Sequence, residues 1–324
     1  MKNPLISIII PAFNVESFIS NSINSVLRQT YNNIEIIIVN DGSTDNTLNV
    51  IENMAGKNKN IIVLSQINKG ISSARNLGLS KSTGEYISFL DSDDSIEPIF
   101  IESMLKKNEE ENSDVVFCLN RTIGKNKNIK LSKNYEDMNK LAVNYMNFDY
   151  FDICCMLIKR SFLLDFNLTF DEKLIVGEDV LFILMCINKT NFSCVPKYLY
   201  NYIYRECSIM NKKWGVNDHI NEIQAWDAIY HKMYLDYRKT DRNLLMDKIG
   251  AKVLNLKVAF MWKLLASGKF NELSNFISTL SYYSQYAVFL RKKELFKLNL
   301  INSKNKKKWF LVRLILTKKK DIIQ

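Results

Sequence analysis

The sequence lacks any apolar run that reaches the roughly 18 residues needed to cross a bilayer. We also expect no secretory signal, because Lys2 is followed by Pro4 and a strand-like run without a small-residue cleavage site. The six cysteines form no CxxC pair, and no histidine lies near them at zinc-ligand spacing. Several of these cysteines lie in apolar runs, so we expect buried free thiols in a cytoplasmic protein.

The glycine-rich motifs that usually cradle nucleotide phosphates are absent as well. No GxGxxG follows the first predicted strand, and no GxxxxGK[ST] occurs anywhere in the chain. A bound nucleotide would therefore need a metal ion and an arginine to neutralise its phosphates. The only two histidines, His219 and His231, lie far from the acidic motifs described below, and we expect neither to bind a metal.

The net charge of +10 is concentrated at one end of the chain. Residues 291–324 hold twelve lysines and arginines against Glu294 and Asp321, and the rest of the chain is balanced. A nucleic-acid-binding domain spreads its basic surface over the fold, so this distribution argues against nucleic acid as a partner. In residues 304–320, lysines flank the apolar segment 309–316, which is typical of an anchor on anionic lipid; a disordered basic tail is the alternative.

Three carboxylates, Asp91, Asp93 and Asp94, directly follow the β-favouring run Tyr86–Leu90. So many like charges at the end of a buried strand favour a divalent cation among them, such as Mn²⁺ or Mg²⁺. Helix capping is the alternative, because aspartate and serine are favoured at helix N-termini. A calcium loop of the EF-hand type is excluded, since its sixth position requires glycine and is Ile96 here.

Apolar runs alternate with amphipathic segments through the first 95 residues, which predicts four strand–helix units in succession. The predicted strands are 5–10, 34–39, 61–64 and 86–90, and the predicted helices are 16–29, 44–53 and 71–81. This alternation implies an α/β fold with a doubly wound, mostly parallel sheet flanked by helices. In such a sheet, ligands bind beyond the carboxyl ends of the strands.

Beyond residue 98 the alternation is less regular. The predicted helices are 98–111, 136–147 and 180–187, and the predicted strands are 115–119, 153–158 and 198–204. We expect Cys154 and Cys155 to be core residues. From about residue 214 the pattern becomes helical throughout, and one face carries the packing residues Trp226, Tyr230, Met233 and Tyr237.

Candidate binding residues follow each of the first four predicted strands, and their convergence at one sheet edge predicts a binding site. These residues are Phe13 and Asn14, then Asp41, then Asn68 and Arg75, and finally Asp91 and Asp93. Further along, Gly177 permits a tight turn, and Glu178 and Asp179 open an apolar helix. Carboxylates at a helix N-terminus are also explained by capping alone.

Five segments together resemble, in order and spacing, the family 2 glycosyltransferases of the GT-A fold. They are Pro11–Asn14, Val39–Asp45, Asn68–Asn76, Phe89–Asp94 and Gly177–Asp179. The resemblance covers roughly residues 1–210. It implies a GT-A catalytic domain at 1–212, with a nucleotide-binding half (1–95) and an acceptor half (96–212), followed by a helical C-terminal region at 213–324.

The resemblance implies an inverting, metal-dependent enzyme with Mn²⁺ or Mg²⁺ as cofactor. Such an enzyme would transfer a hexosyl or N-acetylhexosaminyl group from a nucleotide-sugar, with a UDP-sugar favoured. The acceptor would be a hydroxyl of a glycan or lipid-linked oligosaccharide in the synthesis of a surface polysaccharide such as a capsule, O-antigen or lipooligosaccharide. The basic tail at 304–320 would hold it peripherally on the inner face of the cell membrane.

The resemblance implies that five residues near the first three strands bind the nucleotide-sugar donor. Phe13 would pack on the nucleotide base, Asp41 would bind uracil, and Arg75 would lie in the nucleotide pocket. Pro11 and Asn68 belong to the same nucleotide-sugar-binding set.

The resemblance also implies roles in metal binding and catalysis for the residues of the acidic motifs. Asp93 would bind the metal ion, and Asp91 would lie near both the ribose and the metal. Asp179 would be the base that takes the proton from the acceptor hydroxyl, with Glu178 beside it. Asp94 would be a helix-capping or supporting acid.

Arg205 and Ser208 resemble the element that closes over the diphosphate, although Cys207 departs from the family's pattern. Two other functions are considered. A sugar-phosphate nucleotidyltransferase shares the sheet and the metal, but typically has a glycine- and arginine-rich loop where this chain has Pro11–Asn14. An inactive membrane-associated scaffold would not need the intact acids at 41, 91, 93 and 179.

Overall fold

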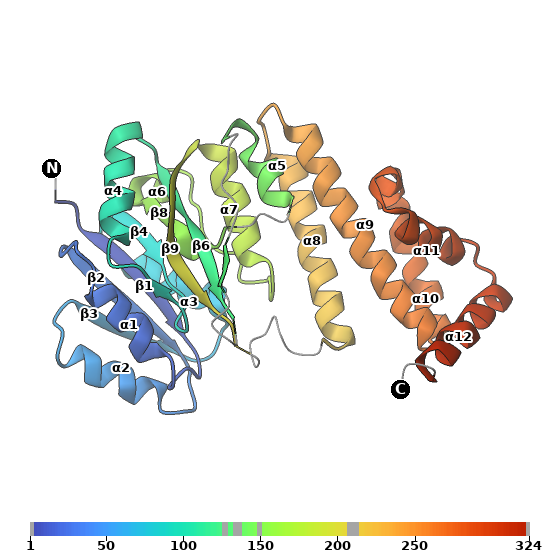
Figure 1. Ribbon diagram of the computed structural model, residues 1–324, viewed down its shortest axis with the longest axis horizontal. Coiled ribbons are helices and arrows are strands. Elements are labelled where there is room, and N and C mark those ends of the chain that lie inside the picture. The colour runs from blue at the N-terminus through green and yellow to red at the C-terminus, as the bar shows by residue number, and fades with distance from the viewer. Residues whose placement is uncertain (1–2, 125–128, 132–137, 148–150, 206–213, 322–324) are drawn as a thin grey trace. The chain divides into compact units, whose positions relative to one another are not determined.

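The computed structural model describes residues 3–124, 129–131, 138–147, 151–205 and 214–321 (Figure 1). The chain divides into two compact units, Met1–Lys213 and Trp214–Gln324. The first unit is built on one sheet, whose strands follow the order β3-β2-β1-β4-β8-β6-β9-β5, with β7 paired to β6. The second unit is helical.

The first four strands are parallel and alternate with helices, as the sequence predicts. Helices α1 and α2 lie on one face of these strands and α3 lies on the other (Figure 1). The bounds are β1 Ile6–Ala12, α1 Ile19–Leu27, β2 Ile34–Asp41, α2 Thr47–Ala55, β3 Ile61–Gln66, α3 Ile71–Lys81 and β4 Tyr86–Phe89. Strands β1 and β2 are buried almost throughout, because helices cover both faces of the sheet.

Helix α3 packs closely on β1 at Gly78. A Cβ atom at this position would lie 2.4 Å from Cγ2 of Ile9, so the approach requires glycine or a shift of that side chain. The contact fixes the second turn of α3, which carries Arg75, against the sheet.

The second half of the sheet is mixed. Strand β8 is antiparallel to both β4 and β6, whereas β6 and β9 are parallel. The bounds are β5 Ser95–Ile96, α4 Phe100–Glu111, β6 Val115–Ile123, β7 Ile129–Leu131, η1 Met138–Lys140, α5 Leu141–Met146, η2 Ile153–Cys155, β8 Met156–Lys159, α6 Arg160–Asp165, α7 Glu178–Lys189 and β9 Phe192–Ile203. The doubly wound fold class is confirmed, and the parallel order predicted for the sheet holds in its first half.

The clearest differences from the predicted elements lie beyond residue 98, where β9 begins at Phe192 and not at the predicted residue 198. The predicted strand 153–158 begins only at Met156, because Ile153–Cys155 form a 3₁₀ turn capped by Asp152, whose Oδ1 accepts the Cys154 N–H at 2.9 Å. The predicted helix 136–147 is helical over Leu141–Met146, and its first two positions lie outside the described residues.

The cysteines of the described residues are free, as predicted. Cys118, Cys154, Cys155 and Cys186 are buried and Cys194 is half-buried. Burial raises the pKa of the Cys194 thiol to about 12. Position 207 lies outside the described residues.

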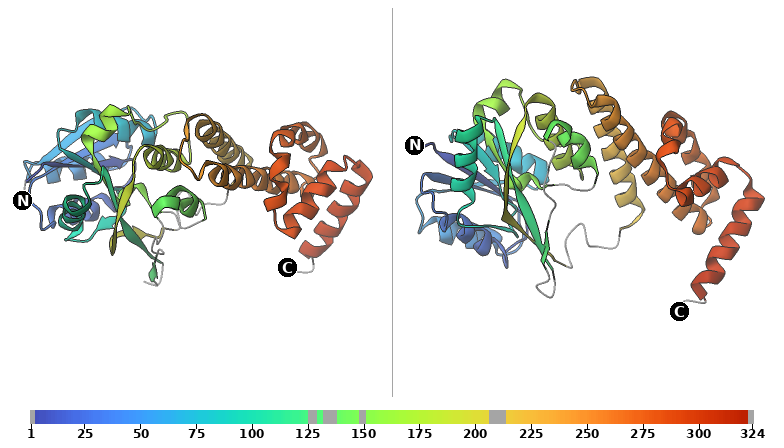
Figure 2. Two further views of the ribbon diagram at one scale, coloured as in Figure 1. Left: turned by 90° about the horizontal axis from the view of Figure 1, so that it is seen from above. Right: turned by 45° about the horizontal axis from the view of Figure 1, so that its top comes forward.

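The second unit is organised around α9, which packs against every other helix of this unit (Figure 2). The bounds are α8 Val216–Asp236, α9 Arg242–Ala266, α10 Phe270–Ile277, η3 Ser278–Phe289, α11 Lys292–Asn302 and α12 Lys306–Asp321. The predicted face of Trp226, Tyr230, Met233 and Tyr237 is buried, which confirms that these are packing residues. Among the described residues, no helix combines the length and apolar character of a membrane span.

The basic segment predicted as a lipid anchor is helical, and one of its apolar residues faces inward. Trp309 is buried; its Nε1 donates to the Leu300 carbonyl at 3.1 Å and its ring lies 6.2 Å from that of Phe270. Trp309 is therefore a packing residue of the second unit, whereas its neighbours Phe310 and Leu311 are exposed.

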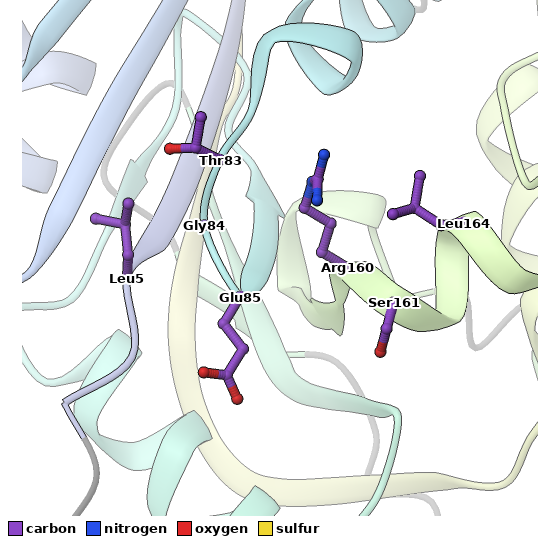
Figure 3. Close-up of a pocket in the computed structure, with 7 residues that line it drawn as sticks. All are labelled: Leu5, Thr83, Gly84, Glu85, Arg160, Ser161 and Leu164. Carbon is purple, nitrogen blue, oxygen red and sulfur yellow. The ribbon is translucent and has the colours of Figure 1, made fainter.

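A hollow of about 400 Å³ lies at the amino ends of the parallel strands (Figure 3). It is lined by Leu5, Thr83, Gly84, Glu85, Arg160, Ser161 and Leu164. In Figure 3 the Glu85 carboxylate and the Arg160 guanidinium point in different directions. The polar residues selected by sequence follow the opposite ends of the strands, so this hollow is separate from them.

Candidate active site

The loops after β1 and β2 are joined by hydrogen bonds. Asn14 has a left-handed φ of 50° at the end of β1. Its backbone N–H donates to Ser43 Oγ at 3.1 Å, and its side-chain Oδ1 accepts the Thr44 N–H at 2.8 Å. Phe13 is 46% exposed beside this link, and Pro11 is buried within β1. The exposed ring of Phe13 is thus available for stacking against a planar group.

Asp41 ends β2 and holds the loop between β3 and α3. Its Oδ1 accepts from Gln66 Nε2 at 2.7 Å and from the Lys69 N–H at 2.9 Å, and its Oδ2 accepts the Gly70 N–H at 2.8 Å. This loop passes so near that a Cβ on Gly42 would lie 2.7 Å from the backbone nitrogen of Asn68. The buried Asp41 carboxylate therefore shapes this loop.

Arg75 lies at the centre of the acidic residues. Its Nη2 is 2.9 Å from Oδ1 of Asp91, and its Nη1 is 3.1 Å from Oε1 of Glu178. Its guanidinium also lies over the Phe170 ring, 5.2 Å from the centroid. The two carboxylates raise the pKa of Arg75 against the opposing effect of burial. The structure thus joins the predicted metal acid and the predicted base pair through one arginine.

Asp93 forms an ion pair with Arg205, which follows β9. The guanidinium of Arg205 also lies over the ring of Phe18, 4.7 Å from its centroid. These contacts bring the residue predicted to face the diphosphate directly to the predicted metal acid. Ser208, its predicted partner, lies outside the described residues.

Asp94 is buried and binds β9. Its carboxylate accepts hydrogen bonds from the Tyr200 hydroxyl and, at 2.7 Å, from the Ile203 N–H. Burial and the charge of Asp91 raise the pKa of Asp94 to about 8. Helix α4 begins at Phe100 without a side-chain cap. The helix-capping interpretation of Asp94 is therefore wrong, and its role as a supporting acid agrees with the contacts.

Asp179 is the second residue of α7, two positions after Gly177, which has a left-handed φ of 76°. Its Oδ1 accepts the N–H of Val180 at 2.7 Å, so part of the capping interpretation is correct. Burial raises the pKa of Asp179, and the nearby positive charge of Arg75 lowers it. Burial, followed by the charge of Asp179, raises the pKa of Glu178 to about 7.

A cluster of three aromatic rings packs beside the first turn of α7. The rings of Phe170 and Phe182 are stacked with centroids 4.2 Å apart, and Phe89 of β4 meets Phe170 edge-on at 5.2 Å. Such contacts give the first turn of α7 a fixed position relative to the end of β4. The strand that delivers the acids and the helix that carries the base therefore share one core.

Asp152 belongs to the same cluster and was missed by the sequence reasoning. Carboxylate oxygens of Asp91 and Asp152 and the sulfur of Cys154 all lie within 4.8 Å of one another. Burial and the charge of Asp91 raise the pKa of Asp152 to about 7. Asp152 occurs in no motif, and its only sequence signal is an acid at the start of an otherwise apolar segment.

The donor atoms around Asp91 fit a hard divalent cation. Arg75 Nη2 pairs with Oδ1 of Asp91 and Arg205 pairs with Oδ2 of Asp93, and carboxylate oxygens such as these are the ligands that Mn²⁺ and Mg²⁺ prefer. Burial raises the pKa of the Cys154 thiol far above its usual range, which makes it a poor ligand for Mn²⁺ or Mg²⁺. The negative charges that raise the pKa of Asp152 are those that a cation would offset.

Comparison with known proteins identifies relatives. Residues 7–165 match the sequence pattern of the family described as Glycosyl transferase family 2. The uncharacterized glycosyltransferase EpsJ of Bacillus subtilis (strain 168) is 44% identical over 115 residues, which make up 36% of this chain and 33% of that protein. The chain thus covers less than two thirds of the length of the curated relatives it matches.

Solved structures share the fold. TarS 1-349 of S. aureus in complex with UDP-GlcNAc has a TM-score of 0.70 and 21% identity, over 97% of this chain and 92% of that one. The mannosyltransferase PcManGT from Pyrobaculum calidifontis, solved with GDP-Man and Mn²⁺, has a TM-score of 0.57 and 15% identity, over 97% and 88%. Residues 7–165 thus match the family 2 glycosyltransferases, and the chain has the GT-A fold of these solved structures.

Proposed function

We propose that the chain is an inverting, metal-dependent glycosyltransferase that takes a sugar from a UDP-sugar. The acceptor would be a hydroxyl of a glycan or lipid-linked oligosaccharide used for a surface polysaccharide. One observation carries this proposal: Arg75 separates two groups of carboxylates at one sheet edge, Asp91 on one side and Glu178 with Asp179 on the other. Glycosyl transfer needs two such groups, one for the leaving diphosphate and one for the acceptor proton.

The base side follows from the position of Asp179. Its carboxylate would take the proton of the acceptor hydroxyl as the acceptor oxygen bonds to the anomeric carbon. The bond from that carbon to the diphosphate oxygen breaks at the same time, and its electron pair leaves with the diphosphate. Attack from the face opposite the leaving group inverts the anomeric centre, so an α-linked donor gives a β-linked product.

The donor side follows from Asp91 and Asp93. These carboxylates would hold a divalent cation, which supplies Lewis-acid stabilisation of the departing diphosphate when bound. Arg205, already at Asp93, would add a positive charge on the same side. The nucleoside would bind at the carboxyl end of β1, near Pro11. It would contact the exposed ring of Phe13 and the loop that Asp41 shapes, which contains Asn68. Mn²⁺ in the PcManGT structure supports the choice of ion.

A ligand screen tests the donor class. We expect UDP-sugars to raise the melting temperature of the protein in the presence of Mn²⁺ more than in its absence, because a bound cation would offset the repulsion between the carboxylates and the diphosphate. GDP-sugars should give a smaller shift. Equal shifts with UDP- and GDP-sugars, or none with either, would contradict the proposed donor.

The basic C-terminal segment supports a peripheral position on the cytoplasmic leaflet. Exposed Lys306, Lys307 and Lys308 precede Phe310 and Leu311, which are 49% and 59% exposed. Lysines beside exposed apolar side chains favour an anionic lipid surface. Such a position would bring the enzyme to a lipid-linked acceptor.

Replacing Phe310 and Leu311 together by serine is expected to weaken binding to vesicles of phosphatidylglycerol and phosphatidylcholine in a sedimentation assay. Burial of the two apolar side chains in the interface is lost, while the buried Trp309 keeps the helix in place. Exposed Val288 of η3, replaced by serine, is the matched control. Unchanged binding of the double variant would show that this segment is not the anchor.

A further inference from the structure

Arg75 connects two parts of the chain that are distant in sequence. It lies on α3, and its partners are Asp91 after β4 and Glu178 on α7, which is 103 positions away. The Arg75 side chain is 3% exposed, and its guanidinium places one Nη on each carboxylate. A guanidinium is the side chain suited to this task, because its planar fork presents donors at fixed angles to two acceptors.

These contacts differ from those expected of an arginine that binds a nucleotide. Both Nη atoms bind protein carboxylates, and Nε is buried without a hydrogen-bond partner among the described residues. The face of the guanidinium is covered by the ring of Phe170. A nucleotide phosphate could reach this group only by displacing Asp91 or Glu178.

We propose that Arg75 is the positioning residue of the catalytic base. Through Glu178 it holds the first turn of α7, and therefore Asp179, at a fixed distance from the donor-side acid Asp91. This inference rests on the proposed function and changes the role expected for Arg75 from nucleotide binding to alignment of the two halves of the reaction. An error of about 1 Å in such an alignment can lower turnover by about 100-fold.

The charge of Arg75 also acts on the base. The groups that act on Asp179 include the carboxylates of Asp91, Asp152 and Glu178 and the cation Arg75. Burial raises the pKa of Asp179 and Arg75 lowers it. Removing this positive charge raises the pKa further, and since the base works only when deprotonated, the acid limb of the pH–rate profile moves to higher pH.

Two substitutions separate geometry from charge. Arg75→Lys keeps the charge but loses the fork, so we expect kcat to fall by about 100-fold while the acid limb stays in place. Arg75→Gln loses both, so kcat falls at least as far and the acid limb moves to higher pH. In both variants the dissociation constant of UDP with Mn²⁺, measured by calorimetry, is expected to stay close to that of the wild type.

Glu178→Gln tests the same contact from the other side, because it removes the charge of Glu178 from the ion pair and keeps the buried Arg75. Its effect on kcat should not add to that of Arg75→Lys, since both break one unit. Arg160→Gln, at the opposite edge of the sheet, is the matched control and should retain wild-type turnover.

Different outcomes identify different errors. Loss of UDP affinity in proportion to turnover in Arg75→Lys would make Arg75 a nucleotide ligand and overturn the proposal. Additive effects of Arg75→Lys and Glu178→Gln, or an unmoved acid limb in Arg75→Gln, would overturn it as well. Wild-type protein that releases no sugar from any UDP- or GDP-sugar would instead overturn the proposed function, and this inference with it.

Discussion

Asp179→Asn is expected to abolish sugar transfer while leaving donor binding almost unchanged. The amide cannot take the acceptor proton, and loss of a general base typically lowers turnover by about 100- to 10,000-fold. An asparagine oxygen can still accept the Val180 N–H, so the start of α7 is preserved. Transfer of radiolabelled sugar and calorimetric binding of the UDP-sugar measure the two effects separately.

Asp165→Asn is the matched control, because this carboxylate is exposed on α6. It should transfer sugar at the wild-type rate. Turnover retained by Asp179→Asn would show that another group is the base, and Glu178 would be examined next, since its pKa is raised to about 7.

Asp93→Ala is expected to remove the effect of metal on donor binding. In the wild type, Mn²⁺ should increase the affinity for UDP, because the cation offsets the repulsion between the diphosphate and the carboxylates. Losing a ligand should weaken Mn²⁺ binding by at least about 10-fold, which is the cost of losing even an outer partner of a metal ligand. Titration of UDP with and without Mn²⁺ measures the difference.

The affinity for UDP measured without Mn²⁺ provides a second test, in which the variant is not expected to be weaker than the wild type. Without Mn²⁺, Asp93→Ala removes one negative charge and releases Arg205 from its ion pair. The affinity for UDP without metal should therefore equal or exceed that of the wild type. If wild type and variant bind UDP equally with and without Mn²⁺, the assignment of Asp93 to a metal site is wrong.

The first half of the fold was predictable because each of its strands and helices is indicated by residues that are neighbours in the sequence. Runs rich in β-branched apolar residues, such as Ile6–Ala12, favour buried strands, and the residues that follow parallel strands meet at one sheet edge. The segments that resemble the family therefore led to the residues that the structure brings together, including Asp91, Arg75 and Glu178.

What could not be predicted depends on contacts between distant segments. The burial of Arg75 between two acids follows from packing of α3 and α7 in one core, and the sequence shows only an arginine in a helix. Asp152 enters the site because the chain turns at Ile153–Cys155, where the apolar pattern favours a strand. Trp309 looked like a lipid anchor because its partners, Leu300 and Phe270, lie in other helices.

The bonds of Asp94 have a consequence for the order of folding. Asp94 ends the segment that would bind the nucleotide, yet its partners Tyr200 and Ile203 come 106 and 109 positions later. Closing so long a loop is slow relative to forming local helices. A fragment ending at residue 95 would leave this carboxylate without these partners, so we expect the acids after β4 to adopt their final arrangement only when β9 joins the sheet.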